Sequence, residues 1–240
     1  MSLGGFQLAL ADMVGSEALC RAIRANPIGA LSPYDLTHRE RRRLAAVVWQ
    51  RGMSATLTVQ RSTRLTPLYT MLPLTIGLLG PLLREVVDAY WAEASRLEVR
   101  FDLEARRFAD YLVPRLRDGL VVTSHEGARV ADLLEIEVAL ETARLGIPVV
   151  PPPGAAWRLA PGLRLVLLSY APLLLLEGAT RSPPDVSAAP TGRFTLLVEI
   201  AEPAPRLLAP PESWTDALLA LGKGDPPAEL RQSGLVVPVG

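Results

Sequence analysis

Proline is unevenly distributed along the chain, and this distribution constrains the fold more than any other feature. Residues 1–120 hold six of the 22 prolines, and residues 121–240 hold sixteen. An interior proline removes a helical hydrogen bond, so long helices are expected mainly in the first half. We therefore predict an α+β protein with a helical bundle over 1–146, a proline-rich linker at 147–156, and a small strand-plus-helix, winged-helix-like module over 157–240.

Helical spacing of apolar residues supports the first part of this prediction. Residues 6–23 have this spacing, although Gly15 weakens the middle of the segment. Thr37 followed by Glu40 has the spacing of a capping box and predicts a helix start. A further helix is predicted after Gly52, with an interruption near 61–67, and another is predicted to begin at Pro81. A later helix is predicted to end at Gly146, its C-cap.

The second half has shorter apolar segments separated by turn residues. Residues 157–178 and 192–211 are predicted to contain strands, joined by a polar, proline-rich connection, and a short helix is expected to begin after Glu212 or Ser213. The segment 193–200 alternates, which predicts a strand with Phe194, Leu196, Val198 and Ile200 on one face.

One uncharged segment, residues 65–83, approaches the length of a membrane span. It contains three prolines, two glycines and three threonines, so buried core helices are favoured over a span. The first fifteen residues lack the basic start of a secretory signal peptide. The sequence therefore predicts a cytoplasmic protein without a membrane segment.

The charge pattern argues against a protein dedicated to nucleic acid. The formal net charge is zero, with 16 basic and 12 acidic residues in 1–120 and 9 and 13 in 121–240. Residues 36–52 nevertheless carry five arginines, among them Arg39, Arg42 and Arg43. On an amphipathic helix these form a solvated or partner-facing surface, and a phosphate contact is the weaker alternative.

The sequence contains few residues that suggest catalysis. Cys20 is the one cysteine, and His38 and His125 are the two histidines, so no ligand set for a metal has usable spacing. Glu137 and Glu141 fall on one helical face, where a structural, solvated role is expected. We predict a chain without intrinsic catalysis or a cofactor of its own, with an enzyme of unrecognised site as an alternative.

The order of motifs resembles the HvfC/BufC-type proteins, a family catalogued as a DNA-binding domain. Residues 60–63 stand where that family has a Tyr-Arg-Asn-Asn-like stretch, although Ser62 and Thr63 replace the asparagines. Later segments are also similar to the family's helices and strand pair. The matching positions are Leu68, Tyr69, Pro73, Leu133, Leu134, Glu137, Leu159, Pro161, Leu163 and Leu165.

This resemblance implies a partner subunit of a multinuclear non-haem iron oxidase, and the oxidase modifies ribosomally made peptides. The methanobactin partner subunit is a relative of this kind. The helical part would dock the oxidase, and the C-terminal module would bind the precursor peptide. As an exposed edge strand, 193–200 could pair with that peptide, with Phe194, Leu196, Val198 and Ile200 as the candidate peptide-binding side chains; an ordinary sheet strand without a ligand is the alternative. The iron would belong to the partner enzyme. Candidate docking residues are Arg61, Arg64 and Tyr69, although the two arginines could equally form local salt bridges. The rival hypothesis is a DNA-binding transcriptional regulator.

Overall fold

A computed structural model describes residues 3–93, 101–121, 126–147, 155–221 and 224–239 of the 240-residue chain. The chain divides into two compact units, and each is described by itself. The N-terminal unit comprises Met1–Thr70 and Pro81–Glu104, and the C-terminal unit comprises Met71–Gly80 and Ala105–Gly240. The protein is α+β and mostly helical, with its strands in the C-terminal part.

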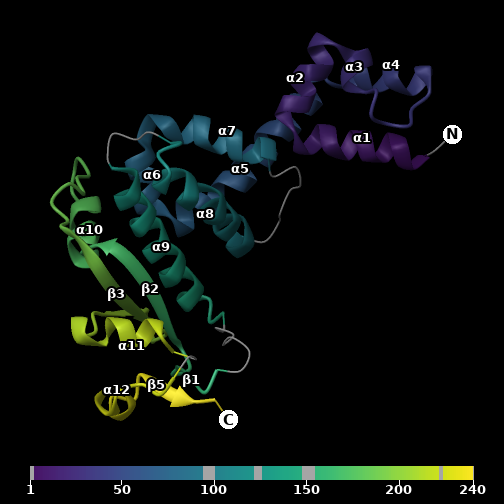
Figure 1. Ribbon diagram of the computed structural model, residues 1–240. Helices are drawn as coiled ribbons and strands as arrows, with labels where there is room; N and C mark the ends of the chain where they lie inside the picture. Colours follow the sequence, from purple (N-terminus) through teal and green to yellow (C-terminus); the bar gives the residue numbers. More distant parts are fainter. Residues whose placement is uncertain (1–2, 94–100, 122–125, 148–154, 222–223, 240) are drawn as a thin grey trace. The chain divides into compact units, whose positions relative to one another are not determined.

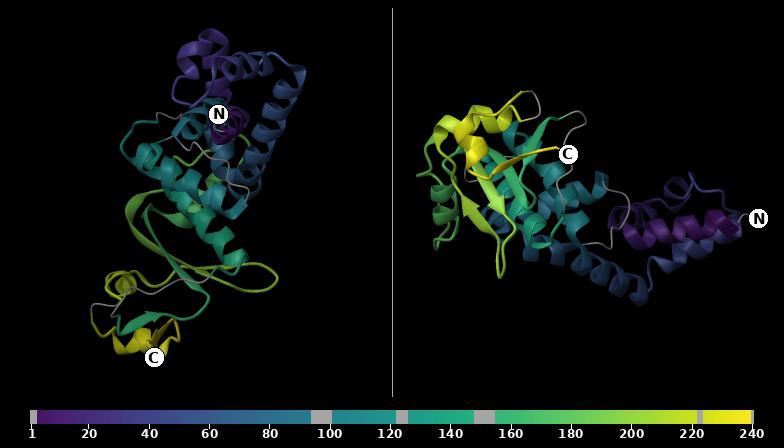
Figure 2. Two further views of the ribbon diagram at one scale, coloured as in Figure 1. Left: turned by 90° about the vertical axis from the view of Figure 1, so that its right-hand side faces the viewer. Right: turned by 90° about the horizontal axis from the view of Figure 1, so that it is seen from below.

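Helices make up the N-terminal unit, and its first four pack together as a bundle (Figures 1 and 2). The helices of this unit are α1 (Leu3–Gly15), α2 (Glu17–Ala25), α3 (Pro27–Ala30), α4 (His38–Val47), α5 (Arg51–Met71, whose last residue belongs to the other unit) and α7 (Leu83–Glu93), which follows the 3-10 turn η1 (Gly80–Leu82).

Local capping decides where these helices begin. The segment predicted as one helix over 6–23 is two helices, because Ser16 accepts a hydrogen bond from the amide of Leu19 and caps α2. The predicted capping box of Thr37 and Glu40 is confirmed at the start of α4. Leu44 of α4 is buried among apolar residues of α1 and α2, whereas Arg39, Arg42 and Arg43 are exposed.

The predicted interruption near 61–67 was wrong. Helix α5 runs without a break from Arg51 to Met71 and contains Pro67. Four threonine hydroxyls in this helix donate hydrogen bonds to the carbonyl four residues earlier, so these residues do not favour an extended backbone here. The helix ends instead at Met71, and Leu72 separates it from Pro73, which begins the next helix.

Helices and two small sheets form the described part of the C-terminal unit (Figure 1). Its helices are α6 (Pro73–Leu79), α8 (Phe101–Arg117, from Ala105 onward), α9 (Gly127–Arg144), α10 (Pro172–Ala179), α11 (Thr215–Leu219, after the turn η2, Glu212–Trp214) and α12 (Ala228–Gln232). Its strands are β1 (Trp157–Leu159), β2 (Leu163–Tyr170), β3 (Thr191–Glu199), β4 (Arg206–Leu208) and β5 (Val236–Pro238).

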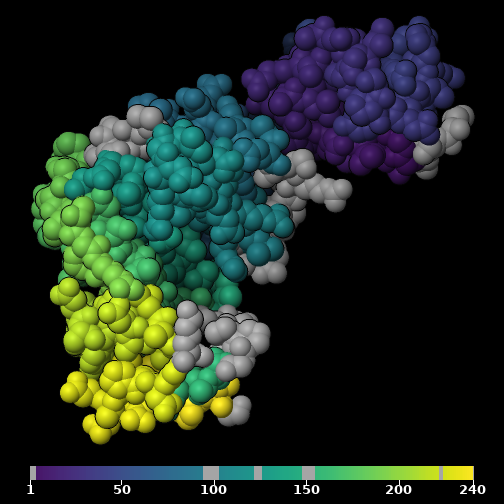
Figure 3. Space-filling view, in the orientation of Figure 1, coloured from purple at the N-terminus to yellow at the C-terminus, as the bar shows by residue number. Residues whose placement is uncertain are grey.

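The strands pair in two antiparallel sheets. One has the order β2-β3-β4, with Leu163 opposite Glu199 and Tyr170 opposite Thr191. The other pairs β1 with β5, so a segment near residue 157 lies against the C-terminal segment, drawn in yellow in Figure 3. Within 157–178, the segment predicted to contain strands, the last part is helix α10 instead, which Pro172 starts at its first position.

The compact units do not coincide with the predicted domains 1–146 and 157–240. Helix α9 packs against β2 and β3, and α6 and α10 pack against α9, so these helices share a unit with the sheet. Gly146, with φ +64°, ends α9 as predicted. Most of the predicted linker, residues 148–154, lies outside the described residues.

The described part of the chain contains no single helix with both the length and the apolar composition needed to span a bilayer. The bent pair Arg51–Met71 and Pro73–Glu93 reaches that length and apolar composition only when its two segments are taken together. Within the uncharged segment 65–83 most large apolar side chains are buried, as expected of core helices.

Candidate functional site

An open groove with a volume of about 860 Å³ lies in the C-terminal unit, between α8, α9 and β2. Its apolar lining includes Val113, Val138, Ile147, Leu165 and Leu167. Its charged lining comprises three arginines and two acidic residues: Arg106, Arg117, Arg164, Asp110 and Glu135.

The periodicities of helix and strand explain how these residues meet. On α8, Arg106, Asp110, Val113 and Arg117 recur three or four positions apart and therefore line one side of the helix. Glu135, Val138 and Thr142 do the same on α9, and β2 contributes residues 164–167. The groove is thus built mainly from α8, α9 and β2 of one unit, with Ile147 and Leu159 completing its lining.

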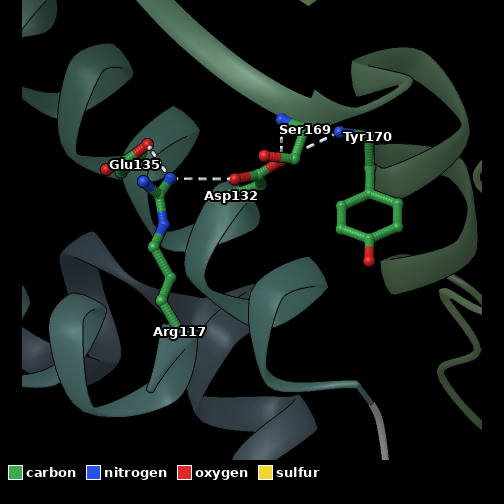
Figure 4. Close-up of polar contacts among 5 residues, drawn as sticks. All are labelled: Arg117, Asp132, Glu135, Ser169 and Tyr170. Carbon is green, nitrogen blue, oxygen red and sulfur yellow. Dashed lines mark hydrogen bonds and ion pairs between the residues drawn. The ribbon is translucent and has the colours of Figure 1, made fainter. Parts of the chain in front are cut away.

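At one end of the groove, Arg117 is held by two carboxylates (Figure 4). Its Nη2 donates to Oδ1 of Asp132 at 3.0 Å and to Oε2 of Glu135 at 2.9 Å. Oδ2 of Asp132 accepts hydrogen bonds from the backbone amides of Ser169 and Tyr170, at 2.6 and 3.0 Å. Asp132 thus joins α9 to β2 where the pairing with β3 shifts register.

Burial affects both of these acidic groups. Asp132 is 0% exposed, and desolvation raises its pKa, against the opposing effect of the two amides and Arg117. Desolvation likewise raises the pKa of Glu135, again opposed by Arg117. The charge of Arg117 is therefore balanced within the protein, and this end of the groove is a structural network.

At the other end, two arginines lie near each other without an acidic partner among the described residues. Nη2 of Arg164 donates to the carbonyl of Thr142 at 3.2 Å, while its Nε is buried and has no hydrogen-bond partner among the described residues. Burial, followed by the nearby charge of Arg106, lowers the pKa of Arg164. Arg106 is exposed, and it makes no hydrogen bond or ion pair within the described parts of the chain.

The predicted peptide-binding residues lie on and just beyond β3, which is the middle strand of its sheet and not an edge strand. Strand β4 covers one edge of β3 over Leu197–Glu199. Leu196 and Val198 are buried, Phe194 is half-buried, and Ile200, which follows the strand, is exposed. Along Thr191–Leu196, β3 pairs with β2 alone among the described strands.

The predicted docking residues are separated by their burial. Arg61 forms ion pairs with Glu17 at 3.2 Å and with Asp88 at 2.9 Å. Arg64 is 4% exposed; its Nε lies 2.8 Å from Oε1 of Glu104, and its guanidinium lies 4.9 Å from the ring centroid of Trp91. Tyr69 is 55% exposed. Only Tyr69 presents a largely accessible side chain.

The expected solvated role was wrong for Glu137, which is buried, and Asp132 on the same helix is buried as well. Oε1 and Oε2 of Glu137 accept hydrogen bonds from the first free amides of α6, those of Leu74 and Thr75. The sequence signal was available: both carboxylates stand among apolar residues in "ADLLEIEVAL", and Arg164 stands likewise in "LRLVLL".

Within the described residues no group of three or more His, Cys, Asp and Glu side chains could hold a metal ion. Cys20 is buried, with a pKa raised by that burial, and His38 opens α4. His125 lies outside the described residues. The arrangement with the clearest chemical use is therefore the groove, which offers apolar contacts and unbalanced positive charge to an elongated ligand.

No protein-family model matches the chain, and no curated protein is similar enough to count as a match.

Proposed function

We propose that the chain is a non-catalytic adaptor that binds a ribosomally made precursor peptide and docks a multinuclear non-haem iron oxidase, whose iron belongs to the partner. The observation that carries the proposal is the groove of the C-terminal unit. Its volume of about 860 Å³ falls in the range of ligand-binding sites, and its lining combines apolar side chains with a few charged ones.

The length of the groove suits an extended peptide. Arg106 and Arg117 both line it and are 11 positions apart on α8, which corresponds to about 16 Å along a helix. An extended chain rises about 3.3 Å per residue, so about five peptide residues would fit alongside the helix. Apolar side chains of such a peptide would contact Val113, Val138 and Leu165.

Main-chain pairing offers a peptide a second contact site, outside the groove lining. Thr191–Leu196 of β3 pair with β2 alone among the described strands, so a peptide could add there as a further strand. Phe194, Leu196, Val198 and Ile200 remain the candidate residues from the sequence. Because Leu196 is buried, its role would be carried by backbone hydrogen bonds, whereas Val198 is already paired with both β2 and β4.

The N-terminal unit is the proposed docking part. Tyr69 and the arginines of α4 are its exposed candidates, and an acidic surface of the oxidase would complement them. The proposal also includes a winged-helix-like arrangement of the segment 157–240 and a cytoplasmic location.

Co-expression with the genes encoded beside it tests the adaptor function. The tagged chain is purified, and the eluate is analysed for a stoichiometric partner, for iron and for a bound precursor peptide. An iron-bearing partner is the expected result. If the chain elutes without iron and without any of the co-expressed proteins, the docking role is refuted.

A second candidate function, duplex DNA binding, is favoured by one observation. Arg39, Arg42 and Arg43 are exposed together on α4. Phosphate contacts release counterions, so such binding would weaken steeply with salt. A gel-shift titration at 50 and 200 mM salt, repeated with a triple Arg→Gln variant of these positions, distinguishes this function from the adaptor.

A further inference from the structure

We infer that Arg106 and Arg164 form a carboxylate-binding site, which anchors an acidic side chain of the peptide held in the groove. This inference rests on the proposed peptide-binding function and names the chemistry that the peptide must carry.

The first argument compares the two ends of the same groove. Arg117 has two carboxylates, Asp132 and Glu135, within 3.0 Å of its Nη2. Arg106 and Arg164, at the end marked by Thr142, have none among the described residues. The chain therefore neutralises one end of the groove and leaves two positive charges close together at the other.

The second argument concerns the cost of this arrangement. Two guanidinium groups repel each other, and the effect is stronger for Arg164 because it is partly withdrawn from water. The Nε of Arg164 is also buried with no acceptor among the described residues. An anion between the two side chains would relieve the repulsion.

The third argument concerns geometry. A guanidinium presents its N–H groups as a fork that matches the two oxygens of a carboxylate. One carboxylate has acceptor sites for both arginines at once. Arg106, which is exposed and has no ion pair within the described chain, can move to complete such a site.

The other groove residues favour a peptide and set its direction. Val113, Val138 and Ile147 provide apolar surface, which a small inorganic anion would not use. Asp110 lies one helical turn from Arg106 and also lines the groove, and Glu135 lies at the far end, so a second acidic side chain would be repelled there. The ligand is therefore a peptide with an acidic residue at one end of an apolar stretch.

Selection from a displayed library of random nine-residue peptides tests this inference on the full chain. Wild-type protein is expected to enrich peptides with Asp or Glu at one fixed position, next to apolar residues. The double variant R106Q/R164Q is expected to enrich apolar peptides without that acidic position. The variant R158Q, which removes an exposed arginine outside the groove, is expected to behave as wild type.

Titration of a selected peptide then measures the contact. Arg106→Gln and Arg164→Gln should each weaken binding about tenfold, as expected for the loss of one charge-assisted hydrogen bond, and Asp110→Asn should strengthen it. The same peptide with Asn or Gln in place of its acid should bind all variants alike. Arg106→Gln removes no hydrogen bond of the described structure, so a folding defect of the Arg164 variant would leave the test intact.

The outcomes separate this inference from the function on which it rests. Enriched peptides without an acidic position overturn the carboxylate site and leave peptide binding standing. Acidic peptides that bind R106Q/R164Q as well as wild type place the contact elsewhere and overturn the site. Absence of any enriched peptide refutes peptide binding itself. Duplex DNA binding that is lost in R106Q/R164Q would assign this end of the groove to phosphate instead.

Discussion

The carboxylate of Glu137 on α9 closes the first turn of α6, since its Oε2 accepts a 2.9 Å hydrogen bond from the amide of Thr75. Its Oε1 accepts a second, at 2.7 Å, from the amide of Leu74. Leu72, the residue at the N-cap of α6, makes no side-chain hydrogen bond. The cap that most helices obtain from a neighbouring residue here comes from a different helix, 62 residues away along the chain.

Replacing Glu137 by Ala should therefore destabilise the protein. Two buried amides would lose their acceptor, at a cost of about 2 kcal/mol. Urea unfolding of the full chain measures this loss. The control is Glu177→Ala on α10, which removes an exposed ion pair with Arg181 and should change stability little. Equal losses in both variants would contradict the capping role.

Arg64 should contribute to stability and not to docking. Its pair with Glu104 is almost fully buried, so Arg64→Leu leaves an unpaired buried carboxylate and should cost about 3 kcal/mol. The double variant R64L/E104L should recover part of that loss, because no charge is then left buried. Arg84→Leu, which removes an exposed arginine on α7, is the matched control for thermal unfolding.

Tyr69 should contribute to docking and not to stability. Its side chain is 55% exposed, so Tyr69→Ala should leave the melting temperature nearly unchanged and reduce co-purification of the oxidase. Trp49→Ala removes another exposed aromatic side chain and serves as the comparison. Loss of the partner in the Trp49 variant alone would place the docking contact elsewhere on the N-terminal unit.

The C-terminal unit should become less stable as the pH rises above about 4, the ordinary range of carboxyl groups. Burial raises the pKa values of Asp132, Glu135 and Glu137, so above this range the native state binds more protons than the unfolded state. Under that condition the free energy of unfolding falls with increasing pH until the raised pKa values are passed.

Hydrogen exchange of the α9 amides, followed between pH 4 and 7 and corrected for intrinsic rates, measures this dependence. Glu137→Gln removes one of the three titrating groups and should flatten the curve. Hydrogen bonds with Thr37 lower the pKa of Glu40. At the start of α4 we therefore expect protection to rise with pH, opposite to α9. Protection of α9 that increases with pH would show that the amides and Arg117 outweigh burial.

Local signals in the sequence determined much of the secondary structure. The capping box at Thr37, the C-cap at Gly146 and the exposed arginine face of α4 were predicted from neighbouring residues, because each depends on contacts within a few positions of the chain. The α+β class followed in the same way from proline content and apolar spacing. Local signals failed at Pro67, which α5 tolerates, and at 172–178, where a run of leucines suits a helix as well as a strand.

Tertiary structure alone decided the units and the groove. Nothing near Asp132 in the sequence shows that its carboxylate accepts hydrogen bonds from backbone amides of β2. Nor does the sequence show that this carboxylate pairs with Arg117 and not with Arg106. The alternation of 193–200 was interpreted as an edge strand, but β3 pairs with β4 as well as with β2 and is the middle strand of its sheet. The sequence sets which side chains are charged or apolar, but contacts between distant segments decide which of those charges are neutralised.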